Sequence, residues 1–188
     1  MFSVDQLVAD CLDALGGDAS QGALAVKEVV ERTVSDPERI EAAIGPPPDL
    51  PVFSTWFTSD QLTVLHVVWP PDVDLMAHDH QMWAAIGLYG GREDNRFYRA
   101  RPEGGLEQRG GRTLRAGDAI VLGDDTVHAV ANPSREWTGA IHVYGGDYFI
   151  SGRRMWPDPE GTPIEFDPAR VISVLEDAAR RASRIDPA

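Results

Sequence analysis

Three histidines in two separate segments are the residues best placed to do chemistry. His78 and His80 flank Asp79, and His128 follows within residues 117–132. Residues i and i+2 of a β-strand point to the same face, so His78 and His80 present two imidazoles to one point while Asp79 faces away. A third imidazole from another strand completes a facial metal site. Three neutral imidazoles leave a divalent ion with its full charge and open positions, which suits anionic ligands and, with iron, dioxygen.

A second pair of polar residues lies in the apolar run at residues 138–144. His142 and Tyr144 are also two positions apart. On a strand they share a face, and we expect them to form a hydrogen-bonded pair that points into the same cavity. Both pairs have a simpler structural interpretation. His78 and His80 could be partly buried, hydrogen-bonded strand residues, and residues 138–144 could be an ordinary strand with a buried tyrosine.

Composition limits the classes of function. With 188 residues, of which 43% are hydrophobic, the chain fits one folded domain over residues 1–188. The net charge of −13 argues against nucleic acid as a partner, and no apolar run approaches the roughly 20 residues that a membrane helix needs. Cys11 is the single cysteine and no secretion signal is evident, so we expect a cytoplasmic protein that acts on small molecules.

The first 45 residues are predicted to be helical. Ser3 is a capping residue for the first helix, Gly16-Gly17 ends it, and Pro37 lies in the first turn of the third. Apolar residues at helical spacing place the three helices over about residues 4–15, 23–33 and 37–44. We leave open whether these helices only cover the rest of the domain or also shape its pocket.

Residues 50–150 are predicted to form a mainly β barrel. Short apolar runs alternate with turn residues, and the glycine pairs 104–105 and 110–111 are typical of hairpin turns. Many short strands with frequent turns indicate a sandwich or a small jelly-roll barrel that encloses a pocket. A last helix is predicted within residues 165–184, and Asp167-Pro168 is its start signal. The predicted strands are 52–58, 62–69, 74–80, 83–89, 95–100, 113–115, 119–122, 126–131 and 138–144.

The spacing of the histidines resembles the two conserved motifs of the cupin superfamily. Residues 78–80 resemble the first motif, and residues 117–132, with a turn at 123–125 before His128, resemble the second. The resemblance implies a cupin-type double-stranded β-helix, the RmlC-like jelly roll, with helices at both ends. Many cupins carry a glutamate ligand five places after the second histidine, where this chain has Ala85. The resemblance therefore implies either a metal-free cupin or a three-histidine site of the thiol dioxygenase kind.

The His142-x-Tyr144 segment resembles the Ser-x-His-x-Tyr segment of cysteine dioxygenase and related thiol dioxygenases. By that resemblance His78, His80 and His128 hold iron(II), although manganese, nickel or zinc also suits three imidazoles. Tyr144 would place its hydroxyl near the metal-bound substrate or oxygen, and His142 would orient that hydroxyl.

The chain departs from the thiol dioxygenase pattern at three places. Ala140 replaces the serine, and Ala85 replaces the cysteine that forms a crosslink to tyrosine in mammalian-type enzymes. Residues 52–58 contain no arginine where the family places its carboxylate anchor. Three strand arginines could substitute, but solvent-facing positions are the simpler interpretation for Arg92, Arg96 and Arg99.

Five further side chains lie on or beside the predicted strands. We interpret His66 as a structural histidine and Glu93-Asp94 as a charged strand edge, whereas Trp69 and Trp83 could line an apolar substrate pocket.

Three functions stay open. The first is an iron(II) dioxygenase that adds O2 to a small thiol and yields a sulfinic acid. The second is a metal-dependent cupin isomerase, lyase or hydrolase in which the ion polarises a substrate oxygen. The third is a non-catalytic module that binds a small ligand. The sequence leaves undecided the substrate, the native metal and whether the protein is a monomer or a homodimer.

Overall fold

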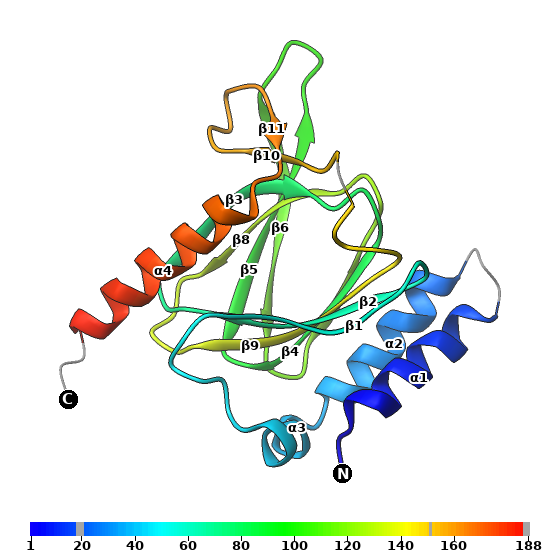
Figure 1. Cartoon of the computed structure of the whole chain (residues 1–188). Coiled ribbons are helices and arrows are strands. Elements are labelled where there is room, and N and C mark those ends of the chain that lie inside the picture. Colours follow the sequence, from blue (N-terminus) through cyan, green and yellow to red (C-terminus); the bar gives the residue numbers. More distant parts are fainter. Residues whose placement is uncertain (18–20, 151, 186–188) are drawn as a thin grey trace.

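A computed structural model describes residues 1–17, 21–150 and 152–185 of the chain. In this part, eleven strands form two antiparallel sheets that face each other (Figure 1). The strands are β1 (Val52–Thr58), β2 (Thr63–Trp69), β3 (Val73–Asp79), β4 (Ala84–Gly90), β5 (Arg92–Ala100), β6 (Leu106–Arg115), β7 (Ala119–Leu122), β8 (Val127–Asn132), β9 (Thr138–Tyr144), β10 (Arg154–Trp156) and β11 (Ile164–Glu165).

The order of the strands identifies the fold. One sheet has the order β1-β2-β9-β4-β7, and the other has the order β11-β10-β3-β8-β5-β6. The eight strands from β2 to β9 divide into β2, β9, β4, β7 and β3, β8, β5, β6, which is the arrangement of a jelly roll, or double-stranded β-helix. The fold class predicted from the sequence is confirmed.

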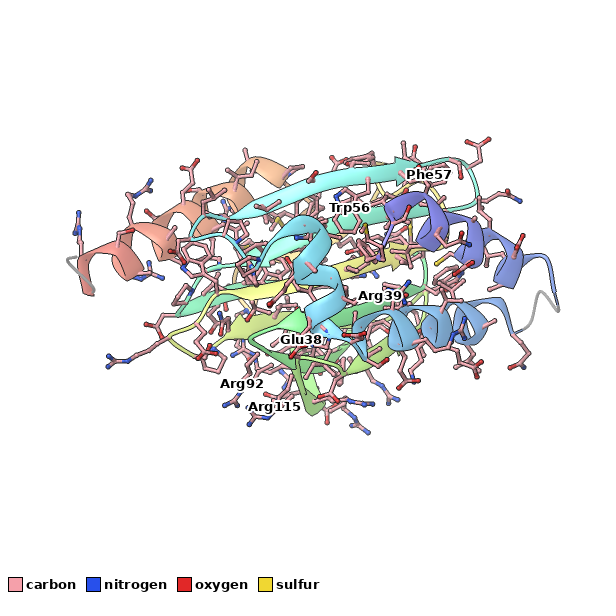
Figure 2. All side chains as sticks on the ribbon, turned by 90° about the horizontal axis from the view of Figure 1, so that it is seen from below. Glu38, Arg39, Trp56, Phe57, Arg92 and Arg115 are labelled. Atoms are coloured by element: carbon pink, nitrogen blue, oxygen red, sulfur yellow. The ribbon has the colours of Figure 1, made fainter. Side chains whose placement is uncertain are left out.

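Three helices cover the outer face of the first sheet: α1 (Val4–Leu15), α2 (Gly22–Val34) and α3 (Pro37–Ile44) (Figure 1). The predicted start signals are present, since the Ser3 hydroxyl accepts from the Gln6 backbone N–H and Asp36 caps α3 just before Pro37. Apolar side chains of α1 and α2 pack on the outward-facing residues of the sheet. Figure 2 shows Trp56 and Phe57 of β1 beside α1.

A fourth helix, α4 (Pro168–Ile185), closes one end of the barrel (Figure 1). Val171, Leu175 and Ala178 are buried in the apolar cluster of the barrel interior, so this helix belongs to the same hydrophobic core as the strands. Among the described residues, no helix is both long and apolar enough to cross a membrane.

The structure corrects the boundaries predicted after residue 90. Gly110-Gly111 is not a hairpin turn, because both residues lie within β6 and pair with Phe97 and Arg96 of β5. The turn between these strands is at residues 101–105, as predicted for Gly104-Gly105, and both glycines have positive φ. Strand β6 was predicted too short because most of its side chains are exposed, and exposed residues leave no apolar alternation to detect.

The region after residue 150 also differs from the prediction. Strands β10 and β11 extend the second sheet beyond the predicted barrel limits of 50–150. The last helix begins at Pro168, as the Asp167-Pro168 start signal predicts, whereas Glu165, which lies within the predicted range 165–184, pairs with β10 instead. β10 has three residues and β11 has two, which is too few for a periodic pattern in the sequence. Such short strands form only because a neighbouring strand pairs with them.

Gly87 of β4 provides a test of how closely α2 packs on the sheet. A Cβ atom at this position would lie 2.5 Å from Val30 Cγ1 and 2.9 Å from Val34 Cγ1. Valine side chains on a helix are stiff, so Gly87→Ala should lower the free energy of unfolding by about 1–3 kcal/mol in urea titrations. Gly110→Ala is the matched control, because a Cβ there meets no atom within 4 Å. Equal stability of the two variants would show that α2 does not depend on this close approach.

Candidate metal centre

The three predicted histidines meet inside the barrel. Strands β3 and β8 are antiparallel neighbours, and their register places His78 directly opposite His128. His80 follows Asp79, the last residue of β3. One ring nitrogen of each histidine lies within 4.8 Å of the other two, and all three side chains are buried. Two adjacent strands therefore bring together a group that could hold a divalent ion, as the spacing predicted.

Hydrogen bonds orient two of these imidazoles. The Nδ1 of His78 lies 3.1 Å from the Met76 carbonyl oxygen, and the Nδ1 of His128 lies 2.8 Å from Asn95 Oδ1. Both acceptors require N–H on Nδ1, which leaves the Nε2 lone pair free. His128 Nε2 is buried and has no hydrogen-bond partner in the part of the chain that the structure describes. A buried lone pair without a partner is costly, and a bound cation would satisfy it, so the donor set fits a metal ion.

A buried carboxylate supports His128 through Asn95. Asn95 Nδ2 donates to Glu93 Oε1 at 2.8 Å, and Trp69 Nε1 donates to Glu93 Oε2 at 2.8 Å. Glu93 is fully buried, which raises the pKa of its carboxyl group. These bonds fix the Asn95 amide with its oxygen toward His128 and thus select the Nδ1–H tautomer.

The interpretation of Glu93-Asp94 as a charged strand edge is wrong, because β5 lies between β8 and β6 within its sheet. Asp94 is on the outer face of β5, where its carboxylate accepts from Arg92 and Thr113. Glu93 and Asn95 alternate with it and point into the barrel. The signal in the sequence was that Glu93 and Asn95 are two positions apart and so share one face of a strand. Because both are polar, that face is easily mistaken for one exposed to solvent.

In the part of the chain that the structure describes, the histidine group includes no carboxylate or thiol. Ala85, five places after His80, lies among the apolar residues that pack against the helices, whereas Ala84 belongs to the interior cluster. The position from which a glutamate could reach the histidines is thus one residue earlier than motif spacing indicated, because successive strand residues face opposite sides. Both positions are alanine, so neither of them supplies a carboxylate ligand.

Burial keeps the histidines neutral. Removal from water lowers the pKa of His78 to about 4, and the guanidinium of Arg153 contributes to this. The pKa values of His80 and His128 are lowered well below the usual range, first by burial and then by the neighbouring histidines. Neutral imidazoles have the free lone pairs that metal binding requires.

The second predicted pair is also formed. His142 Nδ1 and the Tyr144 hydroxyl lie 3.0 Å apart on β9, and both side chains are buried. Burial lowers the pKa of His142 to about 3 and raises that of Tyr144 well above its ordinary value, so both are neutral at pH 7. The Tyr144 ring centroid is 5.0 Å from that of His80, which places the pair beside the candidate ligands.

A small cavity of about 20 Å³ separates these groups. Its volume suffices for about one water-sized species. Most of its walls are aromatic or aliphatic side chains, which keep the polar groups in a water-poor environment. The lining residues are Phe53, Trp69, Leu75, His78, His80, His128, Val130, His142, Tyr144, Tyr148, Phe166 and Val171.

Of the two tryptophans predicted to line the pocket, only one does so. The interpretation of His66 as a structural histidine is supported. Trp69 lines the cavity, whereas Trp83 packs against the helix-facing cluster. His66 lies on the outer face of β2, where its Nε2 is 2.7 Å from the Tyr89 hydroxyl and its ring stacks on Trp56.

The arginines considered as substitutes for a carboxylate anchor lie outside the cavity. Arg92 pairs with Asp94 at 2.8 Å, Arg96 pairs with Asp74, and Arg99 is exposed. Figure 2 shows Arg92 and Arg115 at the outer surface of the barrel. They are surface residues, as the simpler interpretation predicted.

One basic residue near the cavity was not identified from the sequence. The guanidinium carbon of Arg153 lies 4.0 Å from the ring centroids of both Tyr148 and Phe166, which line the cavity. Arg153 follows the segment that carries the family resemblance, and no motif distinguishes it from Arg154 beside it.

Comparisons with known proteins found likenesses only among solved structures, at low sequence identity. No protein-family model and no curated protein sequence matches the chain. An RmlC-like cupin family protein with a double-stranded β-helix fold from Methanocaldococcus jannaschii is 10% identical over 54% of this chain and 84% of its own, with a TM-score of 0.46.

Two further structures match similarly. A protein of unknown function with a cupin-like fold from Ralstonia eutropha is 17% identical over 71% of this chain and 73% of its own, with a TM-score of 0.46. The DMSP lyase DddQ from Ruegeria pomeroyi is 20% identical over 58% of this chain and 53% of its own, with a TM-score of 0.44. All three TM-scores are below 0.5, so neither the fold nor an activity of this chain is argued from these likenesses.

Metal binding provides the direct test of the histidine group. His128→Ala removes one donor, so affinity for zinc(II) or iron(II) should fall by at least about 100-fold, measured by metal analysis after anaerobic purification and by competition with a chelator. His66→Gln is the matched control, because His66 lies outside the group and this variant should retain the metal. Equal metal content in both variants would show that His128 is not a ligand.

The buried histidines also predict how stability depends on pH. Below pH 6.5 the unfolded chain protonates His142, whereas the folded metal-free protein does not until about pH 3. The stabilisation is complete above pH 6.5 and is lost on acidification, with a slope of about 1.4 kcal/mol per pH unit for each such histidine. His142→Gln should therefore reduce the slope of the unfolding free energy between pH 6 and 4 by about one proton. A slope identical to that of the wild type would contradict the burial of a neutral imidazole.

Proposed function

We propose that this protein is an iron(II)-dependent dioxygenase that converts a small thiol into a sulfinic acid. One observation carries the proposal: three buried neutral histidines, without a carboxylate among the described residues, face a tyrosine–histidine pair in one small cavity. A metal-dependent cupin that polarises a substrate oxygen would also use such a pair as a general acid or base, so oxygen uptake is the measurement that separates the two functions.

The overall reaction is R–SH + O2 → R–SO2H. Two S–O bonds form while the O–O bond breaks, and the sulfur loses the four electrons that O2 gains, so no further reductant is needed. A bound iron(II) ion would supply open positions for the thiolate and O2 and the redox chemistry that joins them. His78, His80 and His128 would hold the ion, and Irving–Williams affinities leave manganese, nickel and zinc as alternatives.

Tyr144 and His142 would position a proton beside the reacting sulfur. The hydroxyl is protonated at neutral pH because burial raises its pKa. If Tyr144 donates to His142 Nδ1, then His142 Nε2 carries the hydrogen and can donate into the cavity. In the other tautomer, His142 Nδ1 donates to Tyr144, whose O–H is then free to donate to substrate. Either arrangement leaves one donor available, consistent with the absence of a partner for His142 Nε2 in the described residues.

The cavity walls would exclude competing water. Trp69 and Phe166 close two sides of the cavity, and the Trp69 indole is held by Glu93. In such an environment, hydrogen bonds from Tyr144 to a charged substrate are stronger than in water.

Oxygen consumption tests this function directly. The protein is purified and loaded with iron(II) anaerobically, then mixed with O2 and cysteine, 3-mercaptopropionate or cysteamine in an oxygen electrode. We expect one O2 consumed per thiol and a product heavier than the thiol by two oxygen atoms. Lack of O2 uptake with every thiol by the iron-loaded protein would leave the isomerase, lyase, hydrolase or binding-module alternatives.

Tyr144→Phe distinguishes the role of the hydroxyl from that of the ring. Loss of a positioned proton donor should lower kcat by about 100-fold while iron content stays unchanged. Tyr89→Phe is the control, because its hydroxyl contacts His66 outside the cavity, and this variant should turn over at the wild-type rate. Full activity of Tyr144→Phe would remove Tyr144 from the mechanism.

A further inference from the structure

Glu93 is a buried acid without a basic partner in the part of the chain that the structure describes. Its side chain is fully buried inside the barrel, and none of the ion pairs among the described residues includes it. Most buried carboxylates are paired with a cation, because an isolated charge in a protein interior is costly. Glu93 therefore needs a positive charge that the described side chains do not supply.

The hydrogen bonds of Glu93 suit a carboxylate and not a carboxylic acid. Its Oε1 accepts from Asn95 Nδ2, and its Oε2 accepts from Trp69 Nε1, each at 2.8 Å. An ionised carboxylate has only acceptor sites, whereas a carboxylic acid has an O–H that needs an acceptor of its own. Two N–H donors on two oxygens thus satisfy the charged form and oppose the effect of burial.

Two hydrogen bonds connect this carboxylate with a candidate metal ligand. Asn95 donates to Glu93 through Nδ2 and accepts from His128 Nδ1 through Oδ1, again at 2.8 Å. A hydrogen bond toward negative charge at Nδ1 makes the Nε2 lone pair of an imidazole a stronger donor to a metal. The negative charge of Glu93 thus acts on the lone pair that has no partner among the described residues.

Glu93 also faces the second half of the site. Its other hydrogen-bond donor, Trp69, lines the cavity, and the ring centroids of Trp69 and His142 are 6.1 Å apart in an edge-on arrangement. The charge of Glu93 contributes to the raised pKa of Tyr144. The field of this one carboxylate therefore reaches across the cavity.

The chain lacks a carboxylate next to the histidines but has one a step further away. Ala84 and Ala85 occupy the positions on β4 from which an acid could be a direct ligand. Three neutral imidazoles leave the double charge of a divalent ion uncompensated. Glu93, on the following strand, supplies one negative charge without coordinating the ion.

We infer that Glu93 is the counter-charge of the metal centre and acts on the bound cation through Asn95 and His128, as a positioning residue and not as a ligand. The buried carboxylate and the cation stabilise each other, so the binding of one is coupled to the charge of the other. This inference rests on the metal centre of the proposed function and not on its oxygen chemistry.

Zinc affinity tests the counter-charge without any turnover. Glu93→Gln keeps the shape of the side chain and removes its charge, so the affinity for zinc(II) should fall by about 10- to 100-fold in competition with a chelator. Asp94→Asn is the matched control, because it removes the same charge from the outer face of the same strand, and it should bind zinc like the wild type. Wild-type affinity of Glu93→Gln, or an equal loss in both variants, overturns the inference.

Stability with and without zinc separates a counter-charge from a merely structural residue. In the metal-free protein, Glu93→Gln loses a hydrogen bond and also a buried charge, so its urea midpoint should stay close to that of the wild type. Zinc should raise the midpoint of the variant less than that of the wild type, because the metal binds more weakly. An equal decrease of the midpoint in both forms would show a structural role alone and overturn the inference.

The potential of bound iron is a further readout that packing does not change. A carboxylate attracts iron(III) more strongly than iron(II), because the charge of the ion is larger. Glu93→Gln should therefore raise the iron(III)/iron(II) potential, measured by spectroelectrochemical titration without thiol or O2. An unchanged potential would show that the charge of Glu93 does not act on the ion.

Trp69→Phe keeps the inference testable if Glu93→Gln does not fold. This variant removes one of the two donors that stabilise the charged form of Glu93, so zinc affinity should fall, whereas the control Trp83→Phe, in the helix-facing cluster, should match the wild type. Unchanged zinc affinity of Trp69→Phe would then overturn the inference.

The outcomes also separate this inference from the dioxygenase. A protein in which Glu93→Gln weakens zinc binding and raises the iron potential, but which consumes no O2 with any thiol, would refute the dioxygenase and keep the counter-charge. Oxygen uptake by the wild type, together with unchanged zinc affinity and iron potential in Glu93→Gln, would do the opposite.

Discussion

The candidate site depends on the burial of neutral imidazoles against one another. The register of β3 and β8 places His78 opposite His128, and the residue after β3 brings in His80. In water, imidazoles are partly protonated near neutral pH. Burial lowers the pKa values of these three rings, so each keeps a free lone pair. Such a cluster would only destabilise an empty barrel, and it becomes favourable when a cation occupies it.

Polar groups around the histidines fix their geometry. Glu93 and Asn95 hold the ring of His128 from one side of the barrel. On the other side, the Asp79 carboxylate binds Arg154, which ties the end of β3 to β10. These hydrogen bonds give the buried carboxylates of Glu93 and Asp79 their partners. They also restrict the orientation of the histidine rings that carry the free lone pairs. Rigid strands thus bear the site, which is the arrangement that keeps a catalytic geometry stable.

The two ends of the chain make different contributions to the barrel. The first three helices pack on the outer face of one sheet and are remote from the histidines. The last helix instead inserts Val171 and Leu175 into the interior cluster. The segment after residue 150 also supplies Arg153, which lies beside the cavity, whereas the histidines that line the cavity come from residues 78–142.

The sequence by itself determined the three amino-terminal helices and the shared facing of His78 with His80 and of His142 with Tyr144, because these follow from local periodicity and capping. The jelly-roll class followed from the many short strands together with the resemblance to the cupin motifs. It did not determine that Glu93 is buried, that the interior position near His80 is Ala84, or that Arg153 lies beside the cavity. The sequence shows which residues of a strand share a face. Which of the two faces points into the core is decided by the partner strands. The position of an isolated arginine likewise depends on long-range packing, which leaves no trace in the neighbouring residues.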